Sequence, residues 1–125
     1  MQLTEERIGN ALLLKASGRL DSNTAATFKT ALQPYLEQCK PGGHVIVLDF
    51  ATIDYISSMG FQVLLVAQNR AKTQYGSIAI AALQPGVRAV FEIANFSKAI
   101  RCFDSVRDAI AELAPAAFAS YIKGA

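Results

Sequence analysis

The spacing of apolar and polar positions predicts that strands and helices alternate along this chain. An opening segment around Gln2 to Glu6 is followed by the turn sequence IGN and then by the run ALLLKASGRL, which has turn residues at both ends and predicts a β-hairpin. Residues 21–40 then carry apolar side chains at steps of three and four, as one face of an amphipathic helix does. Pro34 is expected to kink or split that helix, because its nitrogen has no hydrogen to donate.

The run HVIVLDF at residues 44–50 is short and rich in β-branched side chains, which is typical of a central strand buried on both faces. A partly apolar connector over residues 51–56 is expected to follow it. A hairpin, a helix and then strands and helices in alternation predict an α/β fold in which helices pack against a mixed sheet. After the connector we expect a helix from Ser58 to about Gln74 and a strand over 77–83. A short helix opened by Pro85 should follow, with Val87, Val90, Phe91 and Ile93 on its apolar side, and then an edge strand over 99–103. The last expected elements are a helix capped by Asp104 or Ser105 and stopped by Pro115, and one more helical turn or a loosely held tail.

Composition restricts the class of protein. With 52% hydrophobic and 18% charged residues, the chain can bury enough apolar surface to fold as one domain over residues 1–125. The net charge is only +2 and the basic residues are scattered, so no nucleic-acid partner is expected. No apolar run approaches the ~18 residues of a membrane span, and the first ten residues include acids in place of a hydrophobic signal core. We therefore expect a cytoplasmic protein without a membrane span.

Residues that could carry catalysis or bind a metal are sparse. Cys39 and Cys102 lack metal-site spacing and are expected to be reduced thiols. His44 is the only histidine, and the GxSxG motif of serine hydrolases is absent, as are GxxxxGK[ST] and GxGxxG. The carboxylates have no spacing that singles out a general acid and base. The sequence thus predicts a protein that is not an enzyme and has no metal or cofactor.

Two adjacent serines interrupt the apolar stretch YISSMGFQVLL at residues 55–65. They are expected at a helix start, where a serine oxygen accepts a hydrogen bond from a free amide and contributes about 1 kcal/mol, while Gly60 permits close packing of the first turn. One cap needs only one serine. The pair also suits phosphorylation, since a phosphate there meets the positive end of the helix dipole. The residues alone leave capping and phosphorylation both open.

Four short motifs occur in an order that resembles the STAS domain of bacterial anti-sigma factor antagonists. They are a G-x-L-D turn before the first helix, a buried strand ending in L-D-F, a helix start S-S-M-G-F and a late P-x-V-x-x-V-F helix. The resemblance covers about residues 3–113 and implies a STAS-like mixed sheet of four to five strands, with helices packed mainly on one side. The matching residues are Gly18, Leu20, Asp21, Leu48, Asp49, Ser58, Gly60, Phe61, Pro85, Val87, Val90 and Phe91.

The resemblance also implies a function. Unmodified members of the family bind an anti-sigma factor that is also a serine protein kinase of the GHKL ATPase type, and so free its other partner. The kinase phosphorylates a serine that corresponds to Ser58, which releases the complex, and a serine phosphatase resets the cycle. The partner-binding surface is expected to include Asp21, Ser22, Asn23, Asp54, Ser57, Ser58, Met59 and Phe61.

The helix start departs from the usual family motif at two positions. Ser57 stands where an aspartate usually precedes the acceptor, and Met59 stands where a second small hydroxyl residue often follows. Ser57 could therefore compete as the acceptor. One alternative function is a STAS scaffold that is never phosphorylated, in a larger assembly such as a lipid-transport complex. A remote alternative is a small serine hydrolase that uses a serine with His44.

Overall fold

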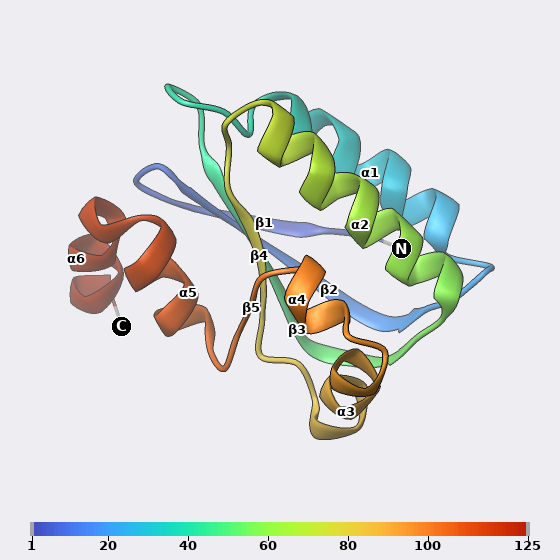
Figure 1. Ribbon diagram of the computed structural model, residues 1–125. Coiled ribbons are helices and arrows are strands. Elements are labelled where there is room, and N and C mark those ends of the chain that lie inside the picture. Colours follow the sequence, from blue (N-terminus) through green and yellow to red (C-terminus); the bar gives the residue numbers. More distant parts are fainter. Residues whose placement is uncertain (1, 125) are drawn as a thin grey trace.

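Five strands form one mixed sheet in the order β1-β2-β3-β4-β5, with helices on both of its faces (Figure 1). The computed structural model describes residues 2–124. β1 is antiparallel to β2 and every later pair is parallel, which confirms the expected hairpin and mixed sheet. In chain order the elements are β1 (Thr4–Ile8), β2 (Ala11–Leu20), α1 (Ala25–Glu37), β3 (Val45–Ile56), α2 (Ser58–Thr73), β4 (Ile78–Ala81), α3 (Pro85–Ile93), α4 (Phe96–Ala99), β5 (Cys102–Phe103), α5 (Val106–Leu113) and α6 (Pro115–Gly124).

Strand β3 is longer than the sequence indicated. Its second half pairs with the second half of β2, where Gly18 lies opposite Ile53 and Leu20 lies opposite Ile56. Two register shifts accompany this pairing, each with one extra residue in β3, and Gly18 adopts a φ of +100° that glycine tolerates better than other residues. The prediction of a connector over residues 51–56 was therefore wrong. β3 carries the chain directly to the start of α2.

Apolar side chains cover both faces of the sheet. The larger cluster lies under α1 to α4 and includes Leu14, Phe28, Phe50 and Phe91. A smaller cluster on the other face joins Val47 to side chains of α5 and α6. Figure 1 shows α5 and α6 across the sheet from α1 and α2. Within residues 2–124 no helix has both the length and the apolarity that crossing a membrane requires.

Several helical details differ from the prediction. Pro34 lies inside α1 without splitting it, and because this side chain is exposed, water can reach the carbonyl group that lacks an amide partner. Pro115 does more than stop α5, since it is the first residue of α6, which has ten residues. The four-residue α4 was not predicted. Val90 and Ile93, expected on the apolar side of α3, are exposed.

Candidate functional site

Ser57 joins the end of β3 to the start of α2. It is the N-cap of α2, and its Oγ accepts a hydrogen bond from the amide of Gly60 at 3.4 Å. Its own amide donates to the carbonyl oxygen of Leu20, the last residue of β2, at 2.8 Å. The half-buried Ser57 is therefore a structural cap, as one of the two interpretations of the serine pair expected.

Ser58 differs from its neighbour in exposure and in bonding. It is the first residue of α2 and is exposed. Within the described part of the chain, its hydroxyl group makes no hydrogen bond. The first turn of α2 also has no acidic residue, so negative charge placed there would meet the helix dipole without repulsion from that turn. Ser58 thus offers an accessible alcohol at a site that favours an anion.

The turn between β2 and α1 is held by side-chain hydrogen bonds. Asp21 Oδ1 accepts from the amide of Asn23 at 2.9 Å, and Asp21 Oδ2 lies 3.4 Å from Arg19 Nε. Thr24 Oγ1 accepts from the amide of Asp21 at 2.9 Å and donates to the carbonyl oxygen of Arg19 at 2.7 Å. The Asn23 amide, with smaller help from Arg19, lowers the pKa of the Asp21 carboxyl group. Ser22 and Asn23 are left exposed at the tip.

Asp54 and Tyr55 lie near the end of β3, and both are exposed. The guanidinium carbon of Arg19 lies 4.2 Å above the centre of the Tyr55 ring, a cation–π contact between neighbouring strands. Asp54 and Tyr55 also line a shallow depression with Gly86 and Val90 of α3. Arg19, Tyr55 and Val90 border the expected site, and the sequence did not predict their positions because only the pairing of β2 with β3 and the position of α3 bring them there.

Met59 and Phe61 face opposite environments. Met59 is 49% exposed, whereas Phe61 is 5% exposed. The Phe61 ring stacks on Phe96 with centroids 4.2 Å apart and meets Phe91 edge-on at 4.8 Å. Phe61 therefore belongs to the core, and a partner could not touch its ring without disrupting this cluster. The prediction that Phe61 is part of the partner-binding surface was therefore wrong.

Gly60 allows the start of α2 to lie against the end of β2. A Cβ atom at this position would lie 2.8 Å from both the carbonyl oxygen and Cγ of Leu20, closer than such atoms approach in real structures. Together with the bond from Ser57 to Leu20, this contact brings the Asp21 turn and the serine pair to the same end of the sheet. The Asp21 turn and the serine pair, which were both expected in the partner-binding surface, are therefore adjacent.

The structure separates His44 from the serine pair at positions 57 and 58. His44 directly precedes β3 and is buried, with Nε2 2.9 Å from the carbonyl oxygen of Tyr35. Ser57 and Ser58 directly follow the same strand, and twelve residues of extended chain span about 40 Å. Within residues 2–124 no group of three or more His, Cys, Asp or Glu side chains is placed to hold a metal ion.

Comparisons with known proteins agree with the fold and with the motifs. The family model of the STAS domain matches residues 2–109. A relative, BtrV of Bordetella bronchiseptica, carries the name of an anti-sigma factor antagonist. It is 32% identical over 96 residues, which make up 77% of this chain and 80% of BtrV.

Solved structures share the architecture at lower sequence identity. An anti-sigma factor antagonist from Mycobacterium paratuberculosis matches with a TM-score of 0.79 and 17% identity, over 90% of this chain and 92% of that chain. The phosphorylated form of the Bacillus protein SpoIIAA matches with a TM-score of 0.63 and 16% identity, over 88% of this chain and 97% of that chain. At these identities the likeness shows the fold alone.

Proposed function

Because this chain belongs to the STAS domain family, we propose that it is an anti-sigma factor antagonist whose partner binding is switched off by phosphorylation of Ser58. The observation that carries the proposal is the exposed hydroxyl group of Ser58, the first residue of α2, which makes no hydrogen bond within residues 2–124. The name of BtrV and the existence of a phosphorylated form of SpoIIAA support a function of this kind.

The geometry favours Ser58 over Ser57 as the phosphate acceptor. A kinase must bring the hydroxyl oxygen into line with the γ-phosphate of ATP, which requires an accessible side chain. Ser57 is half-buried and its oxygen accepts the cap bond from Gly60, so phosphorylation there would disturb the start of α2. Ser58 can react without breaking any hydrogen bond of the described chain.

The docking surface comprises exposed and half-buried side chains of the Asp21 turn, of Asp54 and of the start of α2. Met59 supplies the apolar contact, and the carboxylates of Asp54 and Asp21 supply negative charge. An apolar centre with a polar rim is the usual anatomy of a protein–protein interface. Its members are Asp21, Ser22, Asn23, Asp54, Ser57, Ser58 and Met59.

Phosphorylation acts on this surface through charge. A phosphoserine adds about −1.5 to −2 charges at neutral pH to a surface that already carries the carboxylates of Asp21 and Asp54. Bringing that charge into an interface costs desolvation energy and repels acidic groups unless the partner supplies matching cations. A change of about 3 kcal/mol alters a dissociation constant more than a hundredfold, so no refolding of this chain is needed for a switch.

The partner performs the chemistry in this proposal. A GHKL-type kinase that is also the anti-sigma factor supplies ATP and magnesium, and this chain supplies only the acceptor oxygen. The unmodified antagonist binds the kinase in the cytoplasm and frees the kinase's other partner. A serine phosphatase removes the phosphate and restores the binding form.

The test is to incubate the chain with its cognate kinase and ATP and to locate the phosphate by mass spectrometry. We expect one phosphate on Ser58, none in Ser58→Ala, and an unchanged rate in Ser57→Thr, which keeps an oxygen at the cap. Ser58→Glu should bind the kinase about tenfold more weakly or worse, because it adds permanent negative charge. Transfer of phosphate to Ser57 in the wild-type chain would contradict the proposal.

The substitution of Ser57 for the usual aspartate favours one second candidate, a STAS scaffold that is never phosphorylated. In that case the kinase leaves Ser58 unmodified, and Ser58→Glu binds its partners as well as the wild type does. Ser57→Asp separates the two functions further, because it restores the family motif and keeps a side-chain oxygen at the cap. An antagonist should be phosphorylated at least as fast after this change, and a scaffold should remain unmodified.

A further inference from the structure

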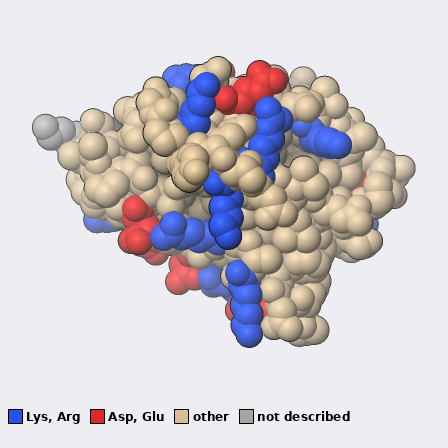
Figure 2. Space-filling view, turned by 45° about the horizontal axis from the view of Figure 1, so that its top comes forward, with Lys and Arg blue, Asp and Glu red and all other residues tan. Residues whose placement is uncertain are grey.

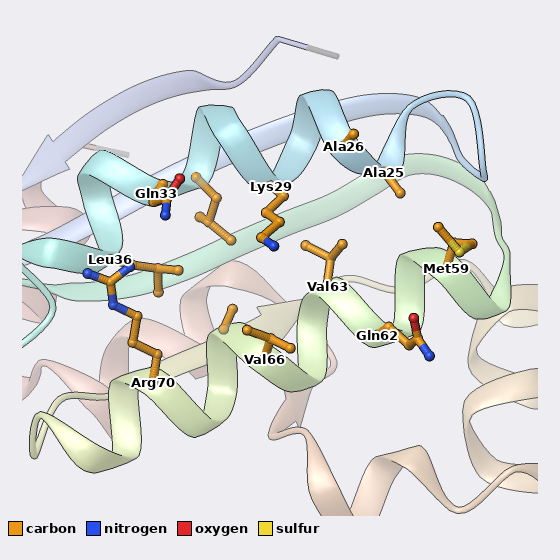
Figure 3. A pocket seen from close by; sticks show the side chains of 12 residues that line it. Ala25, Ala26, Lys29, Gln33, Leu36, Met59, Gln62, Val63, Val66 and Arg70 are labelled. Atoms are coloured by element: carbon orange, nitrogen blue, oxygen red, sulfur yellow. The ribbon is translucent and has the colours of Figure 1, made fainter.

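A groove of about 350 Å³ runs between α1 and α2, away from the docking surface except at one end (Figure 3). Its floor is apolar, because Leu32, Leu36 and Ala67 are buried there. It opens to solvent beside Val66, which is 58% exposed. The volume lies within the range of about 300–1,000 Å³ that is typical of small-molecule sites.

The charged groups of the groove are basic. Lys29 reaches into it from α1 and Arg70 from α2 (Figure 3). Among the residues that the structure describes, no Asp or Glu lines the groove, and the sequence of α2 contains no acidic residue. Within residues 2–124 neither Lys29 nor Arg70 forms an ion pair. Figure 2 shows Lys and Arg side chains spread over the face that carries these helices. The groove therefore complements an apolar body that carries negative charge.

The cation at the far end of the groove is held in place. Arg70 is half-buried, and its Nε donates to Gln74 Oε1 at 3.2 Å, which leaves the terminal nitrogens of the guanidinium for another acceptor. A carboxylate matches those nitrogens in geometry and in charge. The distance along α2 from Arg70 to Met59 at the other end is about 16 Å, from the rise of 1.5 Å per residue.

We propose that the groove binds a single-chain anionic amphiphile of the fatty-acid type. The carboxylate pairs with Arg70 and is attracted by Lys29, and the acyl chain lies over Leu32 and Val63 toward Met59. A helix of a protein partner fits less well, since an α-helix with its side chains is about 10–12 Å wide and a groove of about 350 Å³ can take in only a few of those side chains. The bound chain ends beside Met59, next to Ser58, and so reaches the edge of the docking surface.

The probe for this site is dodecanoate below its micelle concentration, titrated into isotopically labelled protein and followed by amide NMR shifts and by calorimetry. We expect saturable shifts confined to α1 and α2. Decanoate, with two fewer methylene groups, should bind about tenfold more weakly. Acetate should produce no saturable shift, and dodecyltrimethylammonium, with the same chain and the opposite charge, should bind at least about tenfold more weakly than dodecanoate.

Substitutions test the two halves of the site. Arg70→Gln and Lys29→Gln should each weaken dodecanoate binding about threefold to tenfold. Lys72→Gln, an exposed cation on the same helix that does not line the groove, is the matched control and should leave binding unchanged. Val66→Glu places a carboxylate at the groove and should abolish binding, whereas Val90→Glu, at an exposed valine of α3, should have no effect.

The proposal is overturned if the cationic and anionic amphiphiles bind equally, if Arg70→Gln and Lys29→Gln bind as the wild type does, or if the wild-type shifts map outside α1 and α2. The wild-type shift map does not depend on whether any variant folds. Self-association through α1 and α2 without added amphiphile would assign the groove to a second copy of the chain. Binding of an acidic helical peptide there, without competition from dodecanoate, would assign it to a protein partner. Either result also overturns the proposal.

Discussion

The backbone amide of Ser57 donates a hydrogen bond to the carbonyl oxygen of Leu20, with 2.8 Å between the two atoms. Leu20 ends β2 and precedes the Asp21 turn, whereas Ser57 directly follows β3 and caps α2. This one contact fixes the candidate phosphorylation site relative to the turn that completes the docking surface. Any substitution that separates Leu20 from the start of α2 should therefore displace both Ser58 and the Asp21 turn.

Gly60→Ala should destabilise the fold by about 1–3 kcal/mol, because the new methyl group would lie 2.8 Å from the carbonyl oxygen of Leu20. Urea denaturation measures the free energy of unfolding. Gly86→Ala is the control, since a Cβ at Gly86 meets nothing within 4 Å. That change lies in α3 and should leave stability unchanged or raise it by up to about 1 kcal/mol. Equal effects of the two substitutions would contradict the steric explanation.

Ser57→Ala should lower the free energy of unfolding by about 0.5–1 kcal/mol, because it removes the cap oxygen. The bond to Gly60 is long at 3.4 Å, so Ser105→Ala, which removes a cap bond of 3.0 Å to the amide of Asp108, should have an equal or larger effect. Ser58→Ala should change stability by less than about 0.5 kcal/mol, since the side chain is exposed. Thermal denaturation of the three variants shows which of these serines stabilise the fold as helix caps. A Ser58 variant less stable than the Ser57 variant would reverse the roles assigned to the two serines.

Met59→Ala and Phe61→Ala should have opposite consequences, although the two residues are close in sequence. Met59 is half-exposed, so its truncation should change stability by less than about 0.5 kcal/mol and weaken binding of the kinase. Phe61 packs against Phe91 and Phe96, so its truncation should cost about 3–5 kcal/mol. Denaturation and a binding titration with the kinase give the two measurements. Normal kinase binding by Met59→Ala would remove Met59 from the docking surface.

The Asp21 carboxyl group should titrate with a pKa below the ordinary value of 3.8, because the Asn23 amide and Arg19 stabilise its charged form. A pKa that is lower in the folded than in the unfolded state stabilises the fold above the unfolded value, and this contribution is lost as the pH falls through the folded value. The amide shift of Asn23, followed by NMR from pH 6 to pH 2, reports the midpoint. Asp21→Asn should abolish that transition. A midpoint above 3.8 would show that the turn does not hold the carboxylate as the structure indicates.

Cys102 should react slowly with iodoacetamide at pH 8. Burial disfavours the thiolate more than the nearby Arg88 favours it, which raises the pKa of the Cys102 thiol to about 11. Burial also raises the pKa of Cys39. Mass spectrometry after a timed reaction should show alkylation at least about tenfold slower than in the same protein unfolded in urea. Equal rates in the folded and unfolded states would mean that these thiols are not shielded.

Local patterns predicted most of the elements, because a period of 3.6 or 2 residues and the capping residues are properties of neighbouring positions. The helix that starts at Ser58 and the cap at Ser105 are examples. The extension of β3 to Ile56 could not be predicted in this way. Residues 51–56 have no strong pattern of their own and are held as a strand by pairing with β2, which is distant in the sequence.

The candidate site was likewise predicted only in part from the sequence. Two adjacent serines before a glycine identified the helix start, and the motif order identified the family, but neither could say which serine is engaged. The direction of each side chain around the first turn of α2 decides that Ser57 turns back to Gly60, that Ser58 and Met59 face solvent and that Phe61 faces the core.

The amino-acid sequence by itself therefore determined the α/β class and the family and narrowed the candidate phosphoacceptor to Ser57 and Ser58, since these depend on residue type and on spacing along the chain. Only the tertiary structure decided that Ser58 is accessible, that the Asp21 turn lies beside it and that α1 and α2 enclose a basic groove. The exposure of a side chain and its neighbours in space depend on which distant segments pack together, and a local pattern of residues does not specify that packing.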